Sequence, residues 1–213
     1  MKVHLIQEAF DRFKKIASDE AYEGWSLWKL MEDFQENWNT DSSDFKVMFN
    51  HCLSANSELW FSDDYAPKKS MLRYIEQSED LVRAMFNDLF NESKEIVGRI
   101  GRFEFQCDQF YKLERVKKEK AIPHYHDKSM IFTYLAFRYP DQYALFNFPK
   151  FQKFMSNIGA KSIPEEHDTE RFVKACKTLG TLAKKDEALM ELMQDKTNGT
   201  TGIQLLVSQI YQQ

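Results

Sequence analysis

Glycine and proline are scarce in this chain of 213 residues, which contains only 7 Gly and 5 Pro. Because these residues punctuate turns, their scarcity argues against a turn-rich all-β fold and favours helices. Aromatic residues are abundant instead, with 18 Phe, 9 Tyr and 4 Trp making up 15% of the chain. A chain of this length and composition can bury a large aromatic core, as one large domain or two small ones, and is not a disordered tail.

Paired cysteines are also missing, since Cys52, Cys107 and Cys176 lie far apart and form no CxxC motif. This spacing signals neither a disulfide framework nor a common zinc motif, so we expect a reduced compartment, no metal site and no other cofactor. No apolar run approaches the roughly 20 residues of a membrane helix. The N-terminus lacks the apolar segment of a secretory signal. The sequence therefore predicts a cytoplasmic protein with no membrane association.

Catalytic signatures are absent as well. The chain has no GxxxxGK[ST] phosphate loop, no GxGxxG, no GxSxG and no HExxH. The paired acids Asp63–Asp64 and Glu165–Glu166 have no matching lysine motif nearby, and no spacing of Ser, His and Asp singles out a triad. We therefore expect no catalytic residues and predict that the chain is not an enzyme.

Apolar residues recur at helical spacing along most of the chain, which predicts a mainly α-helical fold of many helices. Ser42 or Ser43 is expected to cap the third helix, and Pro67 fits the first turn of the fourth. Gly98 and Gly101 fall inside a long helix, where each costs roughly 1 kcal/mol relative to Ala, so close helix packing or a kink is expected there. The predicted helices cover residues 2–17, 21–37, 45–52, 67–75, 78–90, 94–118, 127–138, 149–158, 168–182, 186–193 and 202–211.

The aromatic run Tyr143–Phe148 is the best candidate for a short extended or β segment. The stretch Ile163–His167 resembles a linker, and Gly159 is a natural residue to follow a helix C-terminus. We predict a helical core domain over residues 1–162 and a C-terminal helical extension over 163–213 that packs on it, or one domain without that boundary.

Charge is distributed unevenly. Between Asp19 and Asp64 there are eleven acidic residues against Lys29 and Lys46, a net of −9 in a chain of net −4, so the remainder carries +5. The most basic stretch, Lys112–Lys128, has a net of +3, and Lys68, Lys69 and Arg73 form a second patch at a helix start. Either patch can contact phosphate, although a solvated helix end is the favoured explanation of the first.

The segment His124-Tyr125-His126-Asp127 contains residue types that bind metals. Two histidines spaced i, i+2 point apart on a helix and face one way only when the backbone is extended. No second ligand cluster accompanies them. The favoured interpretation is therefore a loop that leads into a helix, with Asp127 as the N-cap of that helix. Contact of these side chains with phosphate or bases is a third alternative.

Several stretches over residues 20–150 together resemble the amino-terminal region of McrB-like AAA+ proteins of modification-dependent restriction systems. They include Trp28-Lys29, Phe34–Trp38, Phe45–Phe49, Val82–Phe86, Asp88–Lys94, Arg99–Phe103, His124-Tyr125, Thr133–Leu135 and Phe137–Tyr143. In such proteins a variable N-terminal module selects DNA, and a following GTP- or ATP-hydrolysing module drives a partner nuclease. The resemblance implies a bacterial antiviral defence context, with AAA+ and nuclease subunits as partners, although this chain has no phosphate loop.

From these features we predict a non-catalytic recognition domain that binds DNA, modified DNA included. The alternative is a protein-interaction or oligomerisation module that docks a partner subunit or a phage protein. The predicted nucleic-acid-binding residues are Lys68, Lys69, Arg73, Arg99, Arg102, Lys112, Arg115, Lys117, Lys118, Lys120, His124, His126, Lys128, Arg138 and Tyr143.

Overall fold

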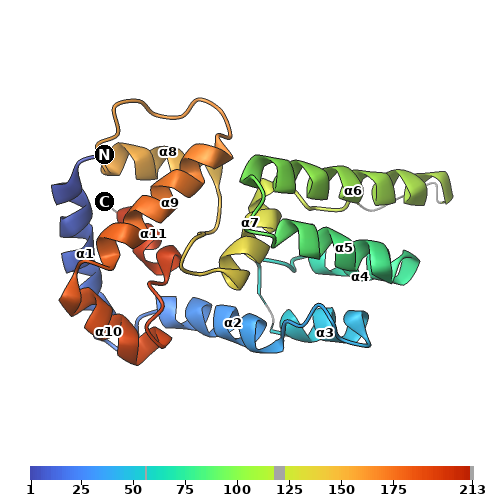
Figure 1. Cartoon of the computed structure of the whole chain (residues 1–213), viewed down its shortest axis with the longest axis horizontal. Coiled ribbons are helices and arrows are strands. Elements are labelled where there is room, and N and C mark those ends of the chain that lie inside the picture. The colour runs from blue at the N-terminus through green and yellow to red at the C-terminus, as the bar shows by residue number, and fades with distance from the viewer. Residues whose placement is uncertain (56, 118–122, 212–213) are drawn as a thin grey trace. The chain divides into compact units, whose positions relative to one another are not determined.

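The computed structural model describes the whole chain except residues 56, 118–122 and 212–213 and the side chain of Lys117. Its described residues form eleven α-helices and no strand (Figure 1), which confirms the predicted mainly α-helical class. Within the described residues, no helix combines the length and the apolar character needed to cross a membrane.

The helices begin and end close to the predicted positions. They are α1 Val3–Ala17, α2 Gly24–Asn37, α3 Phe45–Cys52, α4 Pro67–Gln77, α5 Glu79–Leu89, α6 Ile96–Lys117, α7 Lys128–Arg138, α8 Phe148–Asn157, α9 Thr169–Ala183, α10 Glu187–Thr197 and α11 Ile203–Tyr211. Pro67 opens α4, and Gly159 follows α8 with a φ of +62° that glycine adopts without strain. The cap of α3 differs from the prediction, because the carboxylate of Asp44, not a serine, accepts the Val47 N–H at 2.8 Å.

The chain groups into two compact units. The central unit contains Asp33–Tyr134, and the terminal unit contains Met1–Glu32 together with Leu135–Gln213. Helices α2 and α7 each contribute to both units, because the boundaries at residues 32 and 134 fall inside them. Residues on both sides of the predicted boundary near Ile163 belong to the terminal unit.

In the terminal unit, α11 packs against α1, α8 and α9, and α1 also contacts α10. Of the predicted extended segment 143–148, residues 143–147 form neither helix nor strand, whereas Phe148 begins α8. The buried amide of Gln204 holds this segment in place, because its Oε1 accepts the Leu145 N–H at 2.7 Å. Asp141 plays a similar part at the start of α11, where its carboxylate accepts hydrogen bonds from the N–H and hydroxyl of Thr201.

In the central unit, α5 packs against α4 and α6, and α3 contacts both α4 and α5. Phe86 of α5 is fully buried at the centre of an aromatic cluster. Its ring contacts the rings of Trp38, Phe45, Phe49, Phe90, Phe103 and Tyr134, with centroids 5.0–6.2 Å apart. These rings come from α3, α5, α6 and α7 and from Trp38, which directly follows α2, so one cluster joins four helices and the end of a fifth.

The two glycines within α6 lie in a single uninterrupted helix from Ile96 to Lys117. A Cβ atom built on Gly101 would meet no other described atom within 4 Å, and one on Gly98 would meet only the flexible end of Arg102. Close packing inside the chain therefore does not explain the glycines of α6. Gly180 of α9 is different, since its Cβ would lie 2.9 Å from Ile203 Cδ1 and 3.4 Å from the Asp141 carbonyl oxygen.

We predict that Gly101→Ala raises the free energy of unfolding by about 0.5–1 kcal/mol, because alanine favours helix and the new methyl group enters open space. Urea denaturation followed by circular dichroism measures this change. Gly180→Ala is the matched control, and it should give no gain because its methyl group crowds Ile203. Equal responses of the two variants would contradict the structural difference between the sites.

Candidate functional site

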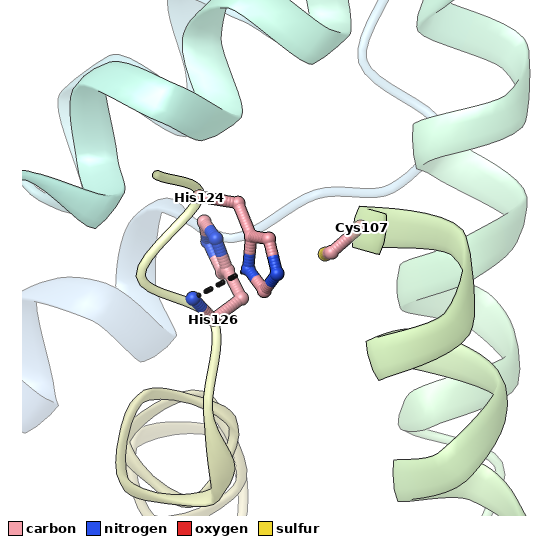
Figure 2. Close-up of side chains that lie close together, drawn as sticks. All are labelled: Cys107, His124 and His126. Atoms are coloured by element: carbon pink, nitrogen blue, oxygen red, sulfur yellow. Dashed lines mark hydrogen bonds between the residues drawn. The ribbon is translucent and has the colours of Figure 1, made fainter. Parts of the chain in front are cut away.

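Three potential metal ligands meet in the central unit. Cys107 lies in the middle of α6, and His124 and His126 lie in the segment that leads into α7. Each residue offers one ligand atom, and these atoms all lie within 4.8 Å of one another. Figure 2 shows the Cys107 sulfur pointing toward the two imidazole rings, which stack with centroids 6.0 Å apart and an interplanar angle of 24°. Sequence spacing did not reveal this cluster, because Cys107 and His124 are far apart along the chain.

The backbone between the two histidines explains why both rings face the same way. Tyr125 has a φ of +59°, in the left-handed region that non-glycine residues rarely adopt. The segment is therefore neither helical nor simply extended. Asp127 caps α7 as predicted, because its carboxylate accepts the Met130 N–H at 3.1 Å.

Hydrogen bonds define the state of each ring. The Nδ1 atom of His124 accepts a hydrogen bond from the backbone N–H of His126 at 2.9 Å. The ring hydrogen therefore lies on Nε2, which donates a hydrogen bond to the Asp108 carboxylate at 3.1 Å. His126 Nε2 lies 3.0 Å from the Tyr134 hydroxyl, while its Nδ1 is buried and has no hydrogen-bond partner. The pKa of His126 is lowered to about 3, chiefly by burial and to a smaller extent by the neighbouring His124. His126 is therefore a neutral imidazole with one uncommitted ring nitrogen.

Several predicted DNA contacts are occupied inside the protein. Arg99 is 2% exposed and donates to the Leu89 carbonyl at 2.8 Å and to the Glu92 carboxylate at 2.6 Å. Arg73 forms a two-pronged pair with the buried carboxylate of Glu114, at 3.0 and 3.3 Å. These guanidinium groups balance acids of their own chain, so contact with a phosphate would require them to exchange partners.

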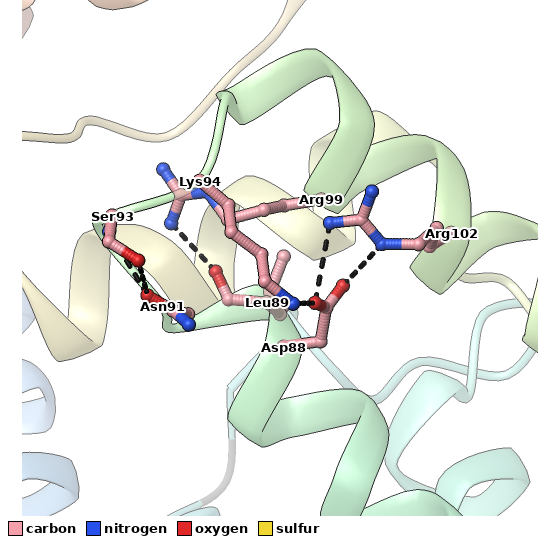
Figure 3. A network of polar contacts seen from close by, with 7 residues as sticks. All are labelled: Asp88, Leu89, Asn91, Ser93, Lys94, Arg99 and Arg102. Carbon is pink, nitrogen blue, oxygen red and sulfur yellow. Dashed lines mark hydrogen bonds and ion pairs between the residues drawn. The ribbon is translucent and has the colours of Figure 1, made fainter.

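Arg102 belongs to a network around Asp88 in which α5 and the first turns of α6 are joined (Figure 3). The carboxylate of Asp88 accepts from Arg102 Nε at 2.7 Å and also from the Lys94 ammonium group. The hydrogen bond from Arg102 lowers the pKa of Asp88, the bond from Lys94 adds to the effect, and partial burial opposes it.

The remaining predicted contacts fall into four groups. Lys69, Lys112 and Arg115 are exposed. Lys68, Lys128 and Arg138 are half-buried; the Lys68 ammonium donates to the Leu53 carbonyl at 2.7 Å, and Arg138 lies over the Tyr139 ring. Tyr143, like His126, is fully buried. Lys118, Lys120 and the side chain of Lys117 lie outside the described residues.

A row of exposed apolar side chains on α6 was not predicted. Val97, Phe105, Leu113 and Val116 are 55%, 57%, 54% and 87% exposed. Phe103, Cys107 and Phe110 mark the buried side of the helix. At 3.6 residues per turn the four exposed positions fall on the opposite side or on the flanks of that opposite side. A signal was available in the sequence, because apolar residues occur around the whole circumference of this helix and not in one stripe.

We predict that Asp88→Asn lowers the free energy of unfolding by about 0.5–1 kcal/mol at pH 7, since the Arg102 and Lys94 partners are half exposed and screened by solvent. Because the folded state has the lower Asp88 pKa, the contribution is present above about pH 4 and is lost as the pH falls through the folded-state value. Urea denaturation between neutral and acid pH should therefore show the two proteins converging. Asp63→Asn, at an exposed loop position with no ion pair in the described structure, should not reproduce this pattern.

No protein-family model, curated protein or solved structure matches this chain. The likeness to the N-terminal region of McrB-like proteins consequently stays a prediction from its sequence motifs.

Proposed function

We propose that the chain is a non-catalytic interaction module whose central unit pairs with a second copy of itself through the exposed side of α6. The observation that carries this proposal is the row of four exposed apolar side chains on that helix. Val97 and Val116 mark its ends, about 28 Å apart along the helix axis. Exposed apolar surface of this extent is typical of protein–protein contact sites.

A second copy is favoured as the partner because the surface is self-complementary in an antiparallel arrangement. Val97 and Val116 are equidistant from the middle of α6, and Phe105 lies within two residues of that middle. A twofold axis through the middle therefore places Val97 at the same level along the helix axis as Val116 of the second copy and brings the two Phe105 rings near each other. Isologous pairing of this kind is the commonest way for soluble proteins to oligomerise.

The polar residues of α6 fit the same register. In this register Arg115 of one copy lies level with Gly98 of the other, and Lys112 lies level with Gly101, so each long cation is level with a position that has no side chain. Glu95 lies one turn before Gly98, within reach of the Arg115 guanidinium of the second copy. The pairing thus gives a role to two glycines that the fold of a single copy does not explain. It also places opposite charges near each other at both ends of the paired helices.

We predict that the protein self-associates, with an average mass above the 25.3 kDa monomer at high concentration. Analytical ultracentrifugation from about 1 µM to 1 mM covers the range in which association free energies of roughly −8 to −4 kcal/mol are measurable. The double variant Phe105→Glu/Val116→Glu should remain monomeric, because two carboxylates would meet at position 105 and one would be buried near Val97 at position 116. Val47→Glu on α3, which is equally exposed, should associate as the wild type does.

Charge reversal tests the antiparallel register itself. Glu95→Arg and Arg115→Glu should each weaken association by placing like charges together, and combining them should restore it. A wild-type chain that stays monomeric up to about 1 mM would contradict the pairing. Association that persists in the Phe105/Val116 variant would exclude this surface.

The resemblance to McrB-like proteins supports a wider proposal, in which this module serves a restriction-type defence system in the cytoplasm. Its role there would be recognition or assembly alongside AAA+ and nuclease subunits, without chemistry of its own. Pairing through α6 would bring two copies of the module together and so raise the avidity of either copy for a shared target.

DNA binding is a second proposal, supported by the exposed cations Lys69, Lys112 and Arg115. Lys69 lies on α4, and Lys112 and Arg115 lie on α6. The ion pair between Arg73 and Glu114 connects these two helices. The exposed set is small, so we expect weak and strongly salt-dependent binding.

We predict that Lys112→Ala/Arg115→Ala weakens duplex binding and makes its logarithmic salt dependence shallower by about two. Fluorescence anisotropy with modified and unmodified duplexes, at several salt concentrations, measures both effects. Lys185→Ala, an exposed lysine of the terminal unit, provides the control. Absence of binding to every duplex at about 50 mM salt would contradict the proposal.

A further inference from the structure

The cluster of Cys107, His124 and His126 offers one sulfur and two imidazole nitrogens as donors. We propose that this cluster is a Zn²⁺ site that ties α6 to the segment leading into α7. Thiolate and imidazole are the donors that zinc prefers, whereas Mg²⁺ and Ca²⁺ prefer oxygen ligands. The sulfur and nitrogen donors therefore favour zinc over Mg²⁺ and Ca²⁺.

The distances allow coordination with little rearrangement. Zinc–sulfur and zinc–nitrogen bonds of about 2.3 and 2.0 Å place the donors of a tetrahedral site roughly 3.5 Å apart. The three donor atoms here are already within 4.8 Å of one another. The difference is at most about 1.3 Å for any pair of donors.

His126 Nδ1 is the observation that separates this cluster from an ordinary buried histidine. The residue is fully buried, and this nitrogen has no hydrogen-bond partner. Burial of a polar atom without a partner costs free energy that a satisfied core histidine would not lose. A metal ion would accept the lone pair of this nitrogen and remove the deficit.

The hydrogen bonds at the other side of each ring fit the same role. His124 Nε2 donates to the Asp108 carboxylate, and His126 Nε2 lies against the Tyr134 hydroxyl. Each ring therefore has its Nε2 held by a partner, which leaves Nδ1 as the nitrogen that a metal would bind. Metal-binding histidines commonly show this pattern, in which the outer nitrogen is fixed by a carboxylate or other polar group. On binding, His124 Nδ1 would exchange the backbone N–H of His126 for the metal.

Binding of Zn²⁺ at this cluster would release a proton. The neutral imidazoles coordinate without losing a proton, whereas burial raises the pKa of the Cys107 thiol and keeps it protonated in the metal-free chain. Zn²⁺ binding therefore forms the Zn–S bond and releases one proton from Cys107 to solvent. The side chain of His124 is 20% exposed, which gives the ion an entry point, and water occupies the fourth coordination position.

The test is a Co²⁺ titration of the untagged, chelator-treated full-length chain, followed by displacement with Zn²⁺. We expect one Co²⁺ per chain, visible bands typical of tetrahedral Co²⁺, and a near-ultraviolet thiolate-to-cobalt charge-transfer band that Zn²⁺ abolishes. Cys107→Ser should lose the charge-transfer band. Cys52→Ser and Cys176→Ser, which alter two other buried thiols, should retain it.

His124→Ala keeps the test decisive if Cys107→Ser fails to fold, because His124 is only half-buried, and His51→Ala at an exposed position is its control. We expect His124→Ala to bind at least tenfold more weakly, and Asp108→Asn to lose about 10–100-fold in affinity while keeping the wild-type spectrum. Wild-type protein without the charge-transfer band, or binding unchanged in both Cys107→Ser and His124→Ala, would overturn the site.

Discussion

The packing of aromatic rings around Phe86 is the interaction on which the central unit depends. Burial of one such side chain stabilises a fold by about 1.5–3 kcal/mol, and each well-oriented ring pair adds about 0.5–1.5 kcal/mol. The cluster joins four helices and the residue that follows α2, and through Phe103 it fixes which side of α6 faces the core. The opposite side of α6 is exposed as a consequence, although it carries valine, leucine and phenylalanine as well.

Burial in the central unit also determines how its charged side chains are paired. Arg99 and Glu114 are buried beside the aromatic core, where an unpaired charge would be strongly unfavourable. Each is therefore matched within the chain, Arg99 by Glu92 and Glu114 by Arg73. Cations that look available in the sequence are thereby used for internal structure. The few that remain exposed make a modest electrostatic surface, which is why the apolar side of α6 carries the stronger functional argument.

The Cys107–His124–His126 cluster lies at the edge of this aromatic core. His126 stacks on Tyr134 with an interplanar angle of 18°, and Tyr134 in turn contacts Phe86. The aromatic packing thus holds one imidazole rigidly, while Asp108 orients the other from the solvent side. A rigid donor set supported by outer hydrogen bonds is the arrangement that favours metal binding over a mobile loop.

The amino-acid sequence by itself determined the helices of this protein. Apolar periodicity, Pro67 and Gly159 act within a few residues, so their effects can be read locally. Local reasoning misplaced the cap of α3 by one or two residues, because serine and aspartate compete for the same role. Only the tertiary structure decided which arginines pair internally, which face of α6 is left exposed, and that Cys107 meets two histidines. Those outcomes depend on how helices dock and on the left-handed Tyr125, and residues distant in sequence carry no local pattern that predicts them.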